Sequence, residues 1–184
     1  IGDVATQANF FHNFSFIISV ANLIVVALQN RQSVARKLER ERFRNEMALA
    51  SEVQRLILPQ DWPQVQHIDI ASVYLPFWNI GGDYIDCIML DNNRTAFCVA
   101  DVSGKGISAA IMMANFQGVL RNTISSKISL ERLVLILNAA VIQVAKFEKI
   151  ITFFVAEYNR KTRVLQYLNA GHTPPYLVSQ NELI

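Results

Sequence analysis

The sequence predicts an α+β fold in which strands and helices occur in separate groups. Strand-like segments come first, two segments with helical spacing follow, and further strand-like segments come last. Elements grouped in this way are typical of α+β domains with antiparallel sheets, whereas a parallel sheet needs strands and helices to alternate. A chain of 184 residues with 52% apolar side chains can bury the core that such a fold requires.

The first 30 residues are almost uncharged. Asp3 is their single charged side chain, and 12 of the 19 residues in the stretch 10–28 are Leu, Ile, Phe or Val. A stretch of this length can cross a bilayer, so a membrane span is one interpretation. Ser15, Ser19 and Asn22 fall on one helical face, and a single polar stripe favours the outer helix of a soluble domain.

Residues 29–58 contain no glycine or proline and predict a continuous helix that Pro59 ends. We expect the part from Met47 onward to pack on the domain that follows. The part around Val34 and Leu38 is expected to pair with a second copy of the chain. The alternative is a solvated linker helix. The apolar stripe of this helix consists of Phe43, Met47, Ala50, Val53 and Ile57.

Beyond Pro63 the pattern changes to short apolar runs separated by turn residues. Alternating apolar and polar residues predict strands, and apolar residues three or four apart predict helices. Ser129 is expected to cap the second helix with its side chain. The strands are expected at residues 68–74, 83–90, 95–102, 151–158, 164–169 and from 174 to 178, and the helices at 107–125 and 130–147.

Charge and cysteine content exclude several classes of protein. The net charge of +2 is too small to indicate binding of nucleic acid. Cys87 and Cys98 lie in apolar strand-like runs, so we expect reduced, buried thiols in a cytoplasmic protein rather than a disulfide. The cysteines and the three histidines show no spacing typical of zinc ligands. The N-terminal stretch also lacks the basic segment and the cleavage site of a secretory signal peptide.

Two glycine-rich loops each present an aspartate at the end of a strand. Asp83 follows Gly81 and Gly82 at the start of one predicted strand, and Asp101 ends the next strand before a Ser-Gly-Lys-Gly turn. Because a short turn joins these two strands, both aspartates are expected at the same end of the sheet. Two carboxylates at glycine-rich backbone, with no His or Cys nearby, predict a site for Mg²⁺ or Mn²⁺. The alternative is that each aspartate only caps a turn.

Five motifs occur in order along the chain. They are Glu-Val-Gln-Arg-Leu-Ile-Leu-Pro at 52–59, Tyr-Leu-Pro at 74–76, Gly-Gly-Asp-Tyr-Ile-Asp at 81–86, Asp-Val-Ser-Gly-Lys-Gly-Ile-Ser-Ala-Ala at 101–110 and Asn-Ala-Gly-His-Thr-Pro-Pro at 169–175. Together they resemble the SpoIIE/RsbU-type branch of the PPM (PP2C-like) serine/threonine phosphatases. The resemblance extends over about residues 47–178.

This resemblance implies an α-β-β-α sandwich and two Mn²⁺ or Mg²⁺ ions, which activate a water for attack on phosphoserine. It implies that Asp83 and Asp101 are the catalytic metal ligands, that Asp101 bridges both ions, and that the backbone carbonyl of Val102 helps to bind the second. Lys105 could steer phosphate, although a solvated turn lysine is the alternative. The resemblance gives supporting positions to Gly82, Asp86, Gly104, Lys105 and His172.

The remaining metal-binding aspartates of the family lie in motifs that this chain does not contain, and no aspartate follows Asp101. We therefore expect residues 59–184 to be the N-terminal part of a PPM domain, with the sandwich incomplete at the C-terminus and the fragment inactive alone. The implied substrate is a phosphoserine protein, an anti-sigma-factor antagonist of the STAS type. The alternative is a non-catalytic, dimerising signalling module whose phosphatase-like region has lost its chemistry.

Residues 16–32 resemble the final helix of GAF sensor domains. In that family the helix continues into a linker that often dimerises. We therefore expect residues 1–30 to end a GAF-like sensor domain and residues 31–58 to form a coiled-coil linker helix. The expected partners are the phosphoprotein substrate and a second copy of the chain, and neither nucleic acid nor a membrane.

Overall fold

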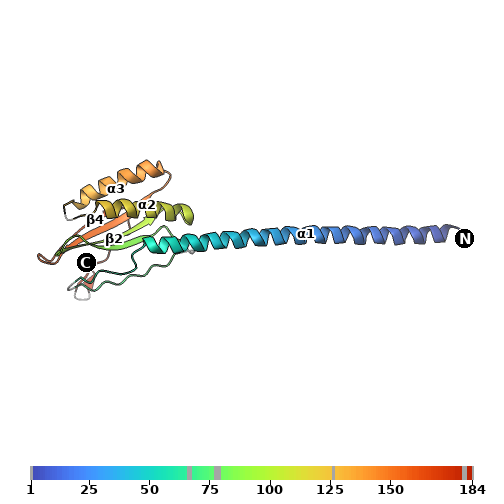
Figure 1. Cartoon of the computed structure of the whole chain (residues 1–184), viewed down its shortest axis with the longest axis horizontal. Coiled ribbons are helices and arrows are strands. Elements are labelled where there is room, and N and C mark those ends of the chain that lie inside the picture. Colours follow the sequence, from blue (N-terminus) through green and yellow to red (C-terminus); the bar gives the residue numbers. More distant parts are fainter. Residues whose placement is uncertain (1, 66–67, 77–79, 126, 180–181, 184) are drawn as a thin grey trace. The chain divides into compact units, whose positions relative to one another are not determined.

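The computed structural model describes residues 2–65, 68–76, 80–125, 127–179 and 182–183 (Figure 1). The chain divides into two units, Ile1–Glu46 and Met47–Ile184. The boundary agrees with the prediction that the helix from Met47 onward belongs with the domain that follows.

The first unit is helical throughout its described residues. It belongs to helix α1, Gly2–Ile57, whose last residues fall in the second unit. The continuous helix predicted for residues 29–58 is therefore confirmed to within one residue. All side chains that the structure describes between residues 14 and 46 are exposed, large apolar ones such as Val34, Leu38 and Phe43 included. Within the described ranges, no helix has the length and hydropathy that a bilayer crossing needs.

The second unit contains a four-stranded antiparallel sheet in the order β1-β2-β3-β4. Its strands are β1 Tyr84–Met89, β2 Arg94–Val102, β3 Ile151–Asn159 and β4 Val164–Ala170. A second, two-stranded sheet pairs β5 Val178–Ser179 with β6 Glu182–Leu183. The grouped strands and their antiparallel pairing confirm the predicted α+β fold.

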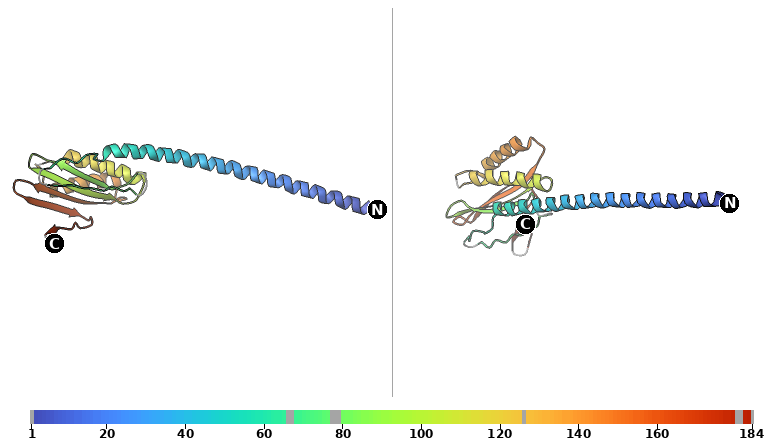
Figure 2. Two further views of the ribbon diagram at one scale, coloured as in Figure 1. Left: turned by 90° about the horizontal axis from the view of Figure 1, so that it is seen from below. Right: turned by 45° about the vertical axis from the view of Figure 1, so that its right-hand side comes forward.

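Helices α2 Ile107–Thr123 and α3 Leu130–Ala145 pack together on one face of the sheet (Figures 1 and 2). At the centre of this layer, the ring of Phe116 on α2 makes edge-to-face contacts with Tyr84 and Phe153 on the strands. The backbone N–H of Arg132 donates to the hydroxyl of Ser129, which confirms the predicted cap of α3. The core is therefore closed on the helical side of the sheet.

Two strand predictions were wrong. Residues 68–74 alternate as a strand does, but they have irregular backbone, since no described segment pairs with them and a strand needs a partner for its N–H and C=O groups. The last strand begins at Val178 rather than at residue 174, because Pro174 and Pro175 supply no N–H for a ladder. The other strand and helix boundaries differ from the predictions by at most two residues.

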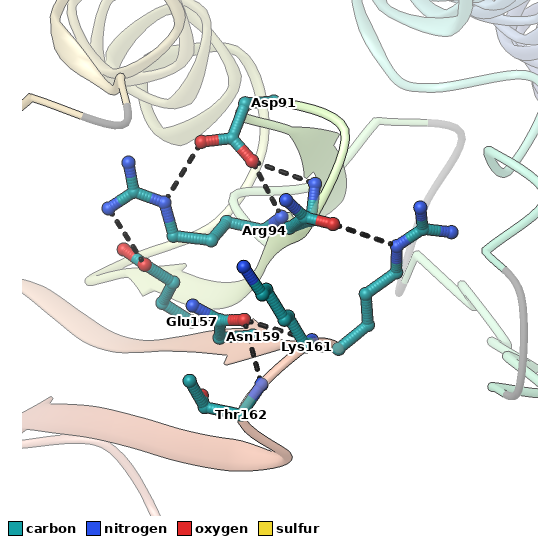
Figure 3. A network of polar contacts seen from close by, with 8 residues as sticks. Asp91, Arg94, Glu157, Asn159, Lys161 and Thr162 are labelled. Atoms are coloured by element: carbon teal, nitrogen blue, oxygen red, sulfur yellow. Dashed lines mark hydrogen bonds and ion pairs between the residues drawn. The ribbon is translucent and has the colours of Figure 1, made fainter.

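A polar network ties the two hairpin turns together at one end of the sheet (Figure 3). Asp91 accepts the N–H groups of Asn93 and Arg94, and these contacts lower the pKa of its carboxyl group. The Arg94 guanidinium bridges Asp91 to Glu157 on β3. This network lies at the opposite end of β1 and β2 from Asp83 and Asp101, so it fixes the hairpin without reaching the candidate site.

A buried ion pair joins the sheet to α2. The side chain of Asp86 is 0% exposed, and its two oxygens accept bonds of 2.8 and 2.9 Å from the guanidinium of Arg121, which is 46% exposed. Tyr84 and the Cys87 N–H also donate to this carboxylate. The structure therefore places Asp86, one of the predicted supporting residues, in the core. The predicted free, buried thiols are confirmed, and burial raises the pKa of Cys87 to about 11.

We expect Arg121→Met to lower the free energy of unfolding by about 3 kcal/mol, because it leaves a buried carboxylate without its cation. The estimate is at the lower end for a broken buried pair, since the Arg121 guanidinium reaches solvent. Urea unfolding followed by circular dichroism measures the change. Arg132→Met, at an exposed position on α3, is the matched control and should change stability by less than about 0.5 kcal/mol. Equal stability of the two variants would contradict the assignment.

Candidate metal centre

Asp83 and Asp101 face each other across the β1–β2 hairpin. Tyr84 pairs with Ala100 in the antiparallel register, so the residue before Tyr84 lies opposite the residue after Ala100. Burial raises the pKa of Asp83, and a hydrogen bond and charge repulsion from Asp101 raise it further. The structure thus brings together the two aspartates predicted as metal ligands. Two carboxylates that repel one another in this way are stabilised by a bound cation.

The two glycine-rich loops line a cavity of about 380 Å³. Gly82 allows them to approach closely: a Cβ atom on this residue would lie 3.0 Å from the carbonyl oxygen of Val102 and 3.0 Å from the Cβ of Ala109. A larger residue would therefore push apart the two loops that carry the carboxylates. The cavity is lined by Pro76, Ile80, Gly81, Gly82, Asp83, Asp101, Val102, Ser103, Gly104, Lys105 and Gly106.

The loop after Asp101 is anchored to the segment that precedes β3. The N–H of Ser103 donates to the carbonyl of Ile150 at 2.8 Å, and the Ile150 N–H donates back to the Ser103 hydroxyl at 2.9 Å. Lys149 donates to the Ser103 carbonyl at 3.1 Å. Gly104 has a φ of 94°, which glycine adopts without strain. Sequence analysis missed this anchor, because its two sides lie more than 40 residues apart.

Helix α1 also reaches the first loop. Gln54 is only 6% exposed, and its amide group makes two hydrogen bonds to Gly81: Nε2 donates to the carbonyl at 2.7 Å, and Oε1 accepts the N–H at 3.0 Å. Gln117 on α2 donates to the Ile57 carbonyl at the end of α1. The end of α1 is therefore hydrogen-bonded to the loop that carries Asp83. The family motif at 52–59 includes Gln54, but the sequence alone gave this side chain no role.

His172 lies beside the carboxylate pair. The Oγ1 atom of Thr152 is 2.8 Å from its Nδ1 atom, and Thr152 pairs with Asp101 in the β2–β3 register. The imidazole partly offsets the rise in the pKa of Asp83. Lys105, the other charged residue in the predicted supporting set, is exposed and lines the cavity. The predicted residues other than Asp86 therefore gather at one end of the sheet.

The donors at this end suit a hard divalent cation. Asp83 and Asp101 supply carboxylate oxygens and Val102 supplies a backbone carbonyl in the same cavity, and oxygen ligands are those that Mg²⁺ and Mn²⁺ prefer. In the part of the chain that the structure describes, no three His, Cys, Asp or Glu side chains form a metal-binding group. The residues present therefore fit such an ion but supply only part of its ligands.

Comparison with known proteins shows which family this chain is similar to. The family model for stage II sporulation protein E (SpoIIE) matches residues 91–183. Phosphoserine phosphatase RsbU of Bacillus subtilis is 30% identical over 172 residues, 94% of this chain and 50% of that protein. Protein IcfG of a Synechocystis strain is 28% identical over 100 residues, 54% of this chain and 16% of that protein. The chain thus spans half or less of these relatives.

A solved structure supports the fold. The SiaA-PP2C domain of Pseudomonas aeruginosa superimposes with a TM-score of 0.56, at 16% identity, over 71% of this chain and 54% of that one. At this identity the likeness concerns the fold alone, and it agrees with the predicted PP2C-like architecture. The family model covers half of the chain, and the similarity to RsbU agrees with it: the chain belongs to the SpoIIE family of RsbU-type PPM phosphatases.

Proposed function

We propose that this chain carries part of the catalytic centre of a metal-dependent protein serine phosphatase. The observation that carries the proposal is the meeting of Asp83 and Asp101 at glycine-rich backbone. Bound Mn²⁺ or Mg²⁺ ions would lower the pKa of a water molecule and neutralise phosphoryl oxygens. Asp83, Asp101 and the Val102 carbonyl would hold the ions, and Lys105 would attract the phosphate group. Gly82 lets the two loops lie close enough for this, and Gly104 supplies the left-handed backbone of the turn that follows Asp101.

The substrate proposed is a phosphoserine protein, an anti-sigma-factor antagonist of the STAS type. Phosphoserine is supported by the similarity to a phosphoserine phosphatase over 94% of the chain. The STAS class follows from the family resemblance of the motifs. Because the chain spans 50% of that relative, we further propose that other parts of the whole protein supply the remaining ligands for two ions. The alternative of a non-catalytic module is not favoured, since both predicted metal aspartates are present and meet.

The experiment is release of phosphate from a serine-phosphorylated STAS protein by the full-length protein. We expect hydrolysis that depends on added Mn²⁺ or Mg²⁺ and stops when the metal is chelated. The 184-residue chain alone is expected to be inactive. A phosphotyrosine peptide is the control and should remain uncleaved. Hydrolysis that is unaffected by chelation, or no hydrolysis by the metal-loaded full-length protein, would refute the proposal.

The domain organisation proposed is a GAF-like end at residues 1–30, a linker helix at 31–58 and the phosphatase part at 59–184. The unbroken helix α1 supports the linker. We also propose a cytoplasmic location, which the two free, buried thiols support. In this arrangement a sensory signal would reach the metal loops through α1.

We further propose that α1 pairs with the same helix of a second copy. Val34 and Leu38 lie on one face of the helix and are exposed in the first unit, and covering an apolar side chain of this kind contributes about 1.5–3 kcal/mol. The flanking Arg and Glu residues suit the edges of a coiled coil.

Sedimentation tests this pairing. The intact chain should be a dimer at high micromolar concentration, and a chain that starts at Glu46 should be a monomer. Leu38→Glu should dissociate the dimer, because it places a charge in the apolar seam. Arg36→Glu, on the opposite side of the helix, is the matched control and should leave it intact. A monomeric intact chain would refute the proposal.

A further inference from the structure

The turn that carries His172 holds its backbone rigidly. The side chain of Asn169 bonds both polar groups of His172: its Oδ1 accepts the His172 N–H at 2.8 Å, and its Nδ2 donates to the His172 carbonyl at 3.0 Å. Gly171 between them has a φ of 75°, which side chains other than glycine rarely adopt, and it forms a β-bridge with Phe153 on β3. These contacts fix the position of the His172 backbone, from which the imidazole extends.

The ring itself is oriented by Thr152. The distance of 2.8 Å between Thr152 Oγ1 and Nδ1 of His172 is that of a hydrogen bond. Within the ranges that the structure describes, the other ring nitrogen, Nε2, makes no hydrogen bond to the protein. When the threonine hydroxyl donates to Nδ1, the proton of a neutral imidazole resides on Nε2. The distance suits either direction of this bond, and donation by the threonine hydroxyl goes with the tautomer in which Nε2 is a donor.

The imidazole ring lies close to the two carboxylates of the candidate metal site. Asp83 immediately precedes β1 and lies opposite Asp101 on β2, and Asp101 pairs in turn with Thr152 on β3. The imidazole is near enough to act electrostatically on Asp83. An N–H donor at the edge of a candidate metal site is suited to an oxygen of an anion bound there, as phosphate oxygens accept such bonds strongly.

We propose that His172 binds the phosphoryl group of the substrate through its Nε2–H, with Thr152 as the positioning residue that holds the ring in the required tautomer. This inference rests on the proposed phosphatase function. It assigns to the Asn-Ala-Gly-His turn a role in substrate binding that is separate from holding the metal ions. The role predicts that loss of the imidazole weakens phosphate binding far more than it weakens metal binding.

The test uses the full-length protein and inorganic phosphate as the probe. Because a hydrogen bond to a charged group is lost, His172→Leu should weaken inhibition of the phosphatase by phosphate about tenfold to a hundredfold. His172→Gln, whose amide N–H can occupy the place of Nε2–H, should recover most of this loss. Calorimetric Mn²⁺ affinity should change far less than phosphate affinity in both variants, and circular dichroism should show that both remain folded. Wild-type phosphate affinity in His172→Leu would overturn the proposal.

A spectroscopic measurement separates this inference from the proposed function. In the Mg²⁺-loaded protein, ¹⁵N NMR of the imidazole should show the Nε2–H tautomer, and added phosphate should shift the Nε2 signal. Thr152→Val should change the tautomer and Thr152→Ser should restore it. An Nε2 signal that phosphate does not move would overturn the inference even in an active phosphatase. If the wild-type protein did not hydrolyse the substrate, the proposed function would be refuted. The NMR titration with phosphate would still decide whether His172 binds phosphate.

Discussion

Asp101→Asn is expected to lower the phosphatase activity of the full-length protein by about three orders of magnitude, and nearly to abolish Mn²⁺ binding. The substitution keeps the size of the side chain but removes the negative charge that faces Asp83 across the hairpin. Bound divalent ions then lack a compensating carboxylate, and stabilisation worth several kcal/mol is lost from the transition state. Calorimetric Mn²⁺ titration and phosphate release from a phosphoserine protein measure the two effects.

Asp91→Asn is the matched control, because it makes the same change at the opposite end of the same hairpin. Asp91 takes part in the network with Arg94 and does not line the cavity that holds Asp101. It should therefore retain Mn²⁺ affinity and turnover. If Asp101→Asn bound Mn²⁺ and hydrolysed phosphoserine as the control does, the assignment of the metal ligands would be wrong.

The hairpin could be predicted from the sequence because its signals are local. Two alternating runs joined by the turn 91–93 predict adjacent antiparallel strands, and this pairing brings Asp83 and Asp101 to one end. Alternation also separates Asp83 from Asp86 within a single motif: residues three apart in a strand point to opposite faces, so Asp86 enters the core. Sequence patterning thus predicted the position of the two aspartates on the sheet.

The contacts that hold the site together were not predictable in the same way. Ser103 and Ile150, Thr152 and His172, and Gln54 and Gly81 each come from separate elements, and a single sequence does not reveal pairings of this kind. The wrong strand at 68–74 has a related cause. Local alternation gives a segment the capacity to form a strand, and a partner supplied by the rest of the fold decides whether it does.

Gln54→Leu is expected to lower Mn²⁺ affinity and phosphatase activity at limiting Mn²⁺ by about tenfold or more, because it removes both hydrogen bonds that hold Gly81. Leucine has nearly the size of glutamine, so packing is kept while the half-buried N–H and C=O of Gly81 lose their partners. A fully buried group left unsatisfied costs about 1–3 kcal/mol, and a half-buried one costs less. Part of this cost appears as lower stability, and part as freedom of the loop that presents Asp83.

Two further variants define the role of the glutamine. Gln54→Glu keeps an acceptor for the Gly81 N–H and loses the donor to its carbonyl, so its Mn²⁺ affinity should fall between those of the wild type and Gln54→Leu. Gln143→Leu, at an exposed position on α3, is the matched control and should behave as the wild type.

The dependence on metal concentration separates a positioning role from ligation. Gln54→Leu retains both metal carboxylates, so raising the Mn²⁺ concentration should restore most of its activity, whereas Asp101→Asn should stay inactive at any concentration. Phosphate release measured over a series of Mn²⁺ concentrations gives both curves. Gln54→Leu with wild-type Mn²⁺ affinity would refute a link between α1 and the metal loop. Such a result would also weaken the case for regulation through α1, because the side chain of Gln54 links this helix to the loop carrying Asp83.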